Sequence, residues 1–136
     1  MILRLTEEQM RLISKETEKR KPIEACGLLF GHANDREAVV RKIVIARNTS
    51  DSSFYFQVDP EEFIKALFDA EEGGVQLIGF FHSHPADPRP SITDVGYMRL
   101  WPGNIWLIIS YIDYSVQAYQ IVDAEIQRIT LKIGKR

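Results

Sequence analysis

The chain has 136 residues, of which 45% are hydrophobic and 26% charged, values typical of a single soluble globular domain. Its formal charge is −2 and its basic residues are scattered, which argues against a nucleic-acid binder. No apolar run approaches the roughly 20 residues that span a bilayer, and the N-terminus lacks signal-peptide features. We therefore expect a cytoplasmic protein without a membrane partner. The single cysteine, Cys26, excludes an intrachain disulfide and a Cys-rich zinc site.

The first part of the chain predicts one helix followed by two strands. Thr6 and Gln9 have the spacing of a capping box, which begins a helix that should end before Pro22. The apolar, glycine-bounded run 24–31 and the β-rich run 39–46 then predict two strands.

The middle of the chain predicts a short strand and a second helix. Residues 54–58 form an aromatic strand candidate, Asp59 and Pro60 begin a helix, and Gly73 and Gly74 end it. The helix carries a broad apolar face that we expect in the core, made of Phe63, Ile64, Leu67, Phe68 and Ala70.

The last part of the chain predicts one helix and four strands. A strand at 75–81 runs into the histidines, and Ser91 should cap a helix that continues to about Leu100. Three further strands are expected at 105–112, 115–122 and 125–133. The order of elements predicts a mixed α/β domain, with a largely antiparallel sheet flanked by helices.

Two of the three histidines, His82 and His84, stand two residues apart where a predicted strand ends. Such side chains project from one face about 6.6 Å apart, so two imidazoles can converge on one ion. A His-x-His motif alone is more often a pair of exposed loop histidines. The residues around it must therefore show whether the pair binds a metal ion. Ser91 and Asp94 should lie together at the mouth of the next helix, either as an ordinary capping box or with Asp94 turned toward the histidines.

Two histidines and one carboxylate would leave a tetrahedral zinc ion with one open position, which suits a hydrolase. The reaction also needs a base that takes a proton from water and returns it to the leaving amine. Glu24 fits this role, because an acid in an apolar strand is costly unless it has a use. The alternative, that Glu24 simply starts the strand at the surface, stays open on composition alone.

Three segments together resemble the JAMM, or MPN-plus, metalloprotease family over nearly the whole chain. They are the strand E-x-C-G-L-L-x-G that begins at Glu24, the motif His82-Ser83-His84-Pro85, and Ser91-x-x-Asp94. The resemblance implies one metalloprotease domain over residues 1–136 with a cytidine-deaminase-like fold. It implies one Zn²⁺ per chain held by His82, His84 and Asp94, with Glu24 as the general base and Ser91 as the oxyanion donor. The six residues between His84 and Ser91 are one fewer than the family usually has.

The resemblance also implies a function. Family members are isopeptidases of the desampylase or deubiquitinase type, which hydrolyse the bond after the C-terminal Gly-Gly of a ubiquitin-like modifier. The chain lacks the long insertion of chain-selective relatives and so resembles the minimal prokaryotic members. An extended substrate tail could add to a strand edge, for which 54–58 is the candidate.

Two other functions stay open. One is a peptidase that processes the C-terminus of a ubiquitin-like or sulfur-carrier precursor, and the other is a non-catalytic scaffold module. A homodimer is the default expectation for a small soluble enzyme.

Four further residues have ordinary structural interpretations. Cys26 is expected to be a small buried apolar residue, and His32 a turn residue without a metal. Trp101 should pack, although its place near the motif loop could bring it to a substrate. Asp87 is a substitute for Asp94 as a ligand, with no helix to fix it.

Overall fold

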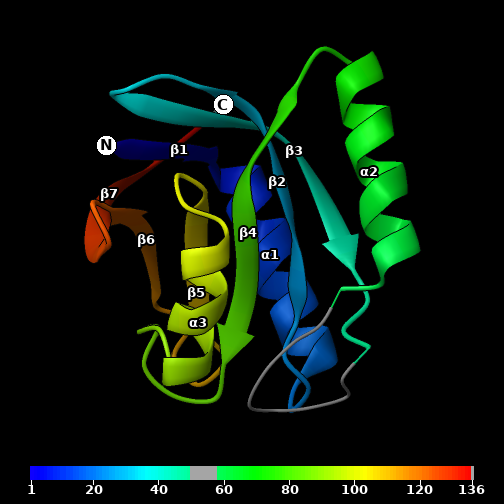
Figure 1. Ribbon diagram of the computed structural model, residues 1–136. Coiled ribbons are helices and arrows are strands. Elements are labelled where there is room, and N and C mark those ends of the chain that lie inside the picture. The colour runs from blue at the N-terminus through cyan, green and yellow to red at the C-terminus, as the bar shows by residue number, and fades with distance from the viewer. Residues whose placement is uncertain (50–57, 136) are drawn as a thin grey trace.

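A computed structural model describes residues 1–49 and 58–135 of the chain (Figure 1). Within this part, the chain forms seven strands and three helices. In chain order they are β1 Ile2–Thr6, α1 Glu7–Arg20, β2 Cys26–Ala33, β3 Glu37–Ala46, α2 Pro60–Glu72, β4 Gln76–His84, α3 Ile92–Leu100, β5 Ile105–Ser110, β6 Val116–Val122 and β7 Glu125–Gly134. None of the described helices is long and apolar enough to cross a membrane.

The strands form one sheet that closes on itself in the order β1-β3-β2-β4-β5-β6-β7, with β7 paired back to β1. Four of the seven described pairings are antiparallel, and β1–β3, β1–β7 and β4–β5 are parallel. The predicted mixed α/β class is confirmed. The sheet is less uniformly antiparallel than the sequence suggested, because β1 is parallel to both of its neighbours and β4 is parallel to β5.

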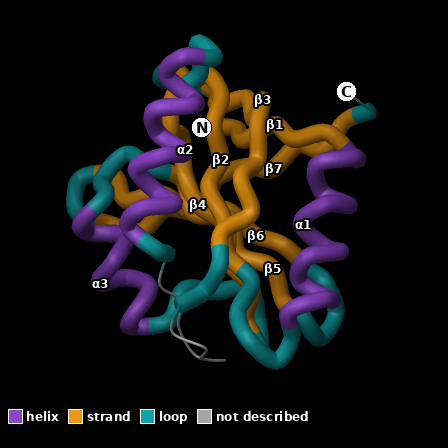
Figure 2. The backbone as a smooth tube through the Cα atoms, turned by 90° about the vertical axis from the view of Figure 1, so that its right-hand side faces the viewer, coloured by secondary structure: helices purple, strands orange, loops and turns teal. Residues whose placement is uncertain are grey.

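Two hydrophobic clusters lie on opposite faces of the central strands. In Figure 2, α1 lies on one side of the strands, and α2 and α3 lie on the other. Side chains alternate along β4, so Phe81 packs with Ile13 of α1 while Phe80 packs with Ala66 of α2 and Met98 of α3. Both faces of β4 are therefore buried, and the end of β4 is held firmly between two packed layers.

The helices begin where the predicted caps place them. Thr6 and Gln9 form the expected reciprocal capping box, with Gln9 N donating to Thr6 Oγ1 at 3.0 Å and Thr6 N donating to Gln9 Oε1 at 2.9 Å. Asp59 caps α2 and Ser91 caps α3 through their side-chain oxygens. These local signals fixed the helix starts because they depend on neighbouring residues alone.

One strand was missed from the sequence, and another was predicted to start too early. The strand β1 was not expected, because its five residues pair only with the distant strands β3 and β7. The strand β2 begins at Cys26, so Glu24 precedes it instead of belonging to it. Of the aromatic candidate at 54–58, residues 54–57 lie outside the described residues, and Val58 forms a single antiparallel bridge with Asn48.

The prediction that the apolar face of α2 belongs to the core was wrong for three of its residues. Ile64 and Phe68 are 54% and 64% exposed, and Leu67 is also exposed. The helix instead packs through the small side chains of Ala66 and Ala70. Small residues allow the helix to approach the sheet closely, which leaves the larger side chains beside them in solvent.

We expect substitution of Gly79 to disrupt the centre of the sheet. A Cβ at this position would lie 2.0 Å from the carbonyl oxygen of Ile105, a backbone atom of the neighbouring strand β5. Gly79→Ala should lower the free energy of unfolding by at least about 2 kcal/mol, because the β4–β5 pairing must move apart. Urea unfolding would measure the loss.

The matched control for this substitution is Gly96→Ala in α3, where an added Cβ meets nothing within 4 Å. Alanine should stabilise a helix interior by about 0.5–1 kcal/mol relative to glycine. Equal unfolding free energies for the two variants would contradict the close approach at Gly79.

Candidate metal centre

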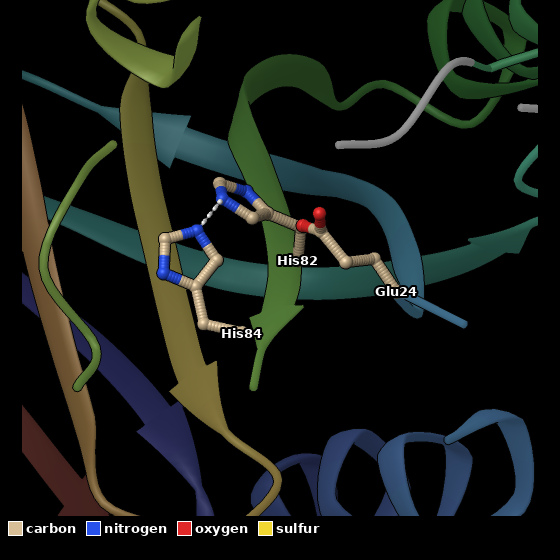
Figure 3. A group of neighbouring side chains, drawn as sticks. All are labelled: Glu24, His82 and His84. Atoms are coloured by element: carbon tan, nitrogen blue, oxygen red, sulfur yellow. Dashed lines mark hydrogen bonds between the residues drawn. The ribbon is translucent and has the colours of Figure 1, made fainter. Parts of the chain in front are cut away.

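Four ionisable side chains from three parts of the chain meet at one end of the sheet. His82 and His84 lie at the end of β4, Glu24 lies shortly before β2, and Asp94 lies in the first turn of α3. In the antiparallel pairing of β2 with β4, Cys26 stands opposite His82, which brings Glu24 alongside the histidines. Figure 3 shows the two imidazoles next to each other and the Glu24 carboxylate close by. All four side chains are buried.

Three of these groups converge on a single point. His82 Nε2 lies 3.2 Å from His84 Nε2, and Asp94 Oδ2 lies 3.2 Å from His82 Nε2 and 2.8 Å from His84 Nε2. Ligands about 2.0–2.1 Å from a tetrahedral ion are separated from one another by roughly 3.3–3.4 Å. The observed triangle is smaller than this by a few tenths of an ångström, so a small movement of the side chains accommodates an ion.

Asp94 serves as a helix cap and as a neighbour of the histidines at the same time. Its Oδ2 accepts a hydrogen bond from Ser91 N at 2.9 Å, and Asp94 N donates to Ser91 Oγ at 3.1 Å. The two interpretations of Ser91 and Asp94 were therefore not exclusive. The capping box fixes the carboxylate, and the six-residue loop is long enough to bring it to the histidines.

The loop after β4 also orients His84. The ring atom Nδ1 of His84 lies 3.3 Å from the carbonyl oxygen of Asp87. With an ion bound, donation from Nδ1–H to this carbonyl would leave the lone pair on Nε2, the atom that faces His82 and Asp94. The Asp87 carboxylate is exposed and pairs with the guanidinium of Arg89 at 2.6 Å.

His82 is enclosed by protein on all sides. It is fully buried, and its ring meets Trp106 edge-on at a centroid distance of 6.2 Å. Burial lowers the pKa of His82, although the hydrogen bond and negative charge of Asp94 act in the opposite direction. A neutral imidazole is the form that binds a metal ion.

The two buried carboxyl groups differ in their ionisation. Burial opposes the charge of Asp94, but hydrogen bonds from His82, His84 and Ser91 outweigh it and hold the pKa of Asp94 well below its ordinary value. Burial, followed by the charge of Asp94, raises the pKa of Glu24 to about 9. At neutral pH and without a cation, Asp94 is therefore a carboxylate, whereas Glu24 keeps its proton.

Glu24 is buried without a polar partner for its side chain. Neither Oε1 nor Oε2 has a hydrogen-bond partner among the residues that the structure describes. One ligand atom each from Glu24, His82 and His84 lies within 4.8 Å of the others, so these three groups could also surround an ion. A buried carboxyl without a partner is costly, and it indicates a group that is absent from the chain itself, such as a cation or water.

The remaining predicted residues lie away from the converging atoms. Cys26 is buried, with its Sγ 3.7 Å from the carbonyl oxygen of Ala46, and His32 is exposed near the end of β2. Trp101 stacks on Phe63 at a centroid distance of 5.6 Å. It packs as expected, while part of its ring stays exposed.

Two neighbours of the site were not found from the sequence. Trp106 lies against His82, and Asn48 donates from Nδ2 to the carbonyl oxygen of Glu24 at 3.0 Å. Both contacts join residues 24 positions apart, and they depend on strand pairing. No local pattern could identify them without a correct arrangement of β2 to β5.

Comparison with known proteins shows the family of this chain. Residues 6–122 match the family described as prokaryotic homologs of the JAB domain. A desampylase of Pyrococcus furiosus is 44% identical over 65% of this chain and 60% of its own length, so the match spans less than two thirds of that relative. A desampylase of Haloferax volcanii is 32% identical over 82% of this chain and 79% of its own.

A solved structure extends the similarity to the whole fold. A protein from Desulfitobacterium hafniense superposes with a TM-score of 0.85 at 30% identity, covering 100% of this chain and 94% of that one. The family match covers most of the chain, and Glu24, both histidines, Ser91 and Asp94 lie within the matched range. The chain therefore belongs to the prokaryotic JAB-domain family, as a minimal member of the JAMM type.

Proposed function

We propose that this chain is a zinc-dependent isopeptidase that hydrolyses the bond after the C-terminal Gly-Gly of a ubiquitin-like modifier. One observation carries the proposal: His82 Nε2, His84 Nε2 and Asp94 Oδ2 lie within 3.2 Å of one another, beside a buried carboxyl group without a polar partner. The two similar desampylases support the substrate class.

In this proposal, His82, His84 and Asp94 hold the ion and Glu24 does not. Asp94 Oδ2 already contacts both imidazoles and accepts a hydrogen bond from Ser91 N, whereas a carboxyl oxygen of Glu24 lies within 4.8 Å of the imidazole nitrogens without a hydrogen bond to them. Two imidazoles and one carboxylate form a donor set that suits zinc and leaves one position open. When bound there, zinc lowers the pKa of a water ligand to roughly 7 and supplies a nucleophile at neutral pH.

Glu24 acts as the general base and then as the general acid. Its carboxylate accepts a proton from water at an Oε atom and later donates that proton to the leaving lysine amine. Its buried position raises its pKa above the ordinary value, and a nearby cation favours the ionised form that a base requires. The absence of a partner for Oε1 and Oε2 among the described residues leaves both atoms available for this transfer.

Ser91 stabilises the oxyanion of the tetrahedral intermediate. In its bond to Asp94 N, Ser91 Oγ is the acceptor, so the hydroxyl proton is not used in that bond. Ser91 is only half-buried at the start of α3, where a substrate carbonyl could reach it. A donor of this kind contributes about 10²–10³ in rate.

We further propose that residues 1–136 form one metalloprotease domain with a cytidine-deaminase-like arrangement, located in the cytoplasm and assembled as a homodimer. A peptidase that processes a linear precursor would use the same side chains. Offering the protein a linear Gly-Gly fusion and a lysine-linked conjugate together would show which bond it prefers. A scaffold module without activity would leave both intact.

The first test is the substitution of the proposed base. Glu24→Gln should lower kcat for a Gly-Gly–lysine conjugate by about 10²–10⁴-fold, because an amide cannot transfer the proton. Zinc content should stay at about one ion per chain, since Glu24 is not a ligand in this proposal. Hydrolysis would be followed by electrophoresis, and zinc by elemental analysis.

A matched control is Glu37→Gln on β3, which removes an exposed ion pair with Arg4 and should keep the full rate. If Glu24→Gln cleaved at the rate of the unchanged protein, Glu24 would not be the base.

The second test concerns the ligands. His84→Ala should lose both zinc and hydrolysis, because it removes one of three ligand atoms from a buried site. His32→Ala, which removes an exposed histidine near the end of β2, should lose neither. Full zinc occupancy in His84→Ala would exclude this ligand set.

The third test uses the stability of the metal-free protein. The pKa of Glu24 is about 9 when folded against an ordinary value of 4.5, so between these values the folded state binds one more proton than the unfolded state. The free energy of unfolding should therefore fall as pH rises, by up to about 1.4 kcal/mol per pH unit. His82 and Asp94, whose pKa values are lowered, have already lost their protons above about pH 7 in both states.

Urea unfolding of chelator-treated protein between about pH 7 and about 8.5 would measure this slope. Glu24→Gln has no proton to lose, and its stability should vary less over the same range. Parallel slopes for the two proteins would contradict the raised pKa of Glu24.

A further inference from the structure

The peptide group between Glu24 and Ala25 is held at both ends by side chains. Its carbonyl oxygen accepts a hydrogen bond from Asn48 Nδ2 at 3.0 Å, and its N–H group donates to Ser83 Oγ at 2.8 Å. This peptide lies just before β2, which begins at Cys26. Asn48 and Ser83 are themselves buried, so neither bond competes with bulk water.

We propose that Asn48 and Ser83 are positioning residues that hold this peptide group and thereby aim the Glu24 carboxylate at the substrate. The inference rests on the proposed function, in which Glu24 is the general base. Neither residue touches the reacting atoms. Each acts through the backbone of Glu24.

The need for such support follows from the surroundings of Glu24. Its two carboxylate oxygens have no hydrogen-bond partner among the described residues, so no polar contact of that kind aligns the side chain. Its direction then depends on the backbone from which it extends and on the apolar packing around it. A displacement of about 1 Å at a catalytic group can cost about 10²-fold in rate, so the orientation of this peptide matters.

The two supports come from different parts of the fold. Ser83 lies between His82 and His84 on β4 and faces away from them, because side chains alternate along a strand. The same strand therefore presents two histidines on one face and holds the backbone of the base from the other. Ser83 N also donates to the carbonyl oxygen of Ala25 at 2.9 Å, which locks the two segments in register.

Asn48 approaches from the opposite end of the peptide group. It follows β3 and forms a backbone bridge with Val58, just before α2. Only the Nδ2 atom of its amide can donate to a carbonyl oxygen, so the chemistry of the contact fixes the orientation of the amide. This side-chain donor satisfies a buried backbone carbonyl, as buried polar groups require.

The test compares Ser83→Ala and Asn48→Ala with the unchanged zinc-loaded protein, on a ubiquitin-like protein joined through Gly-Gly to a lysine side chain. Each variant should lower kcat by about 10- to 100-fold, with KM and zinc content within about twofold. Ser83→Thr keeps the hydroxyl and should restore most of kcat. A loss of zinc or a raised KM in both alanine variants, or a wild-type kcat in both, would overturn the proposal.

A matched control is Gln120→Ala. Gln120 Nε2 also donates from a buried amide to a backbone carbonyl, that of Gly103 at 2.9 Å. Its strand partner Ile105 aligns with Gly79, near the beginning of β4 and away from the histidines. This variant should lose a similar amount of stability in urea while kcat stays unchanged. An equal loss of kcat would show that the effect of Asn48→Ala is general destabilisation, and would overturn its positioning role.

The double variant gives a second measurement. Because Asn48 and Ser83 hold one peptide group, the combined loss of kcat should be smaller than the product of the two single losses. Independent, multiplicative losses would overturn a shared action on Glu24.

Glu24→Gln in the same assay tests the role of Glu24 as base separately from the positioning role of Asn48 and Ser83. If it is active, the proposed base is wrong. If it is inactive while Asn48→Ala and Ser83→Ala keep the wild-type kcat, only the positioning role is wrong.

Discussion

The antiparallel pairing of β2 with β4 is the constraint on which the candidate site depends. Cys26 pairs with His82, and this alignment sets Glu24 next to the histidines although the two segments are nearly 60 positions apart in sequence. A shift of one residue would turn the side chains of one strand to the opposite face. The hydrogen bonds between Ala25 and Ser83 hold the pairing at the point where such a shift would matter most.

Local features of the site could be predicted from the sequence, because they depend on residues close together in the chain. The separation of His82 and His84 places both on one face of a strand, and the capping pattern of Ser91 and Asp94 places both at a helix start. Whether Asp94 faced the histidines could not be settled by spacing. The structure shows that one carboxylate oxygen accepts the capping bond and contacts both imidazoles.

Features that depend on distant contacts could not be predicted in the same way. The closing strand β1 has only five residues and gains its place from pairing with β3 and β7. The pattern of α2 showed an apolar face but not which part of it meets the sheet, and Ala66 and Ala70 make that contact in place of the larger Ile64 and Phe68. Hydrophobic periodicity identifies a face, while the packing of the partner surface decides how the helix is rotated.

The electrostatics of the site connect its stability to its chemistry. Asp94 is stabilised as a carboxylate by the hydrogen bonds that it accepts, and its negative charge is one cause of the raised pKa of Glu24. Because their pKa values are shifted in opposite directions, the two carboxyl groups can perform different tasks at one pH. One can serve as a metal ligand and the other can transfer protons. The same arrangement destabilises the metal-free protein, because the Glu24 carboxyl is then buried without a hydrogen-bond partner among the described residues. In the proposed function, a cation bound between the histidines and Asp94 would relieve this cost, so binding of the metal should both stabilise the fold and favour the ionised form of Glu24.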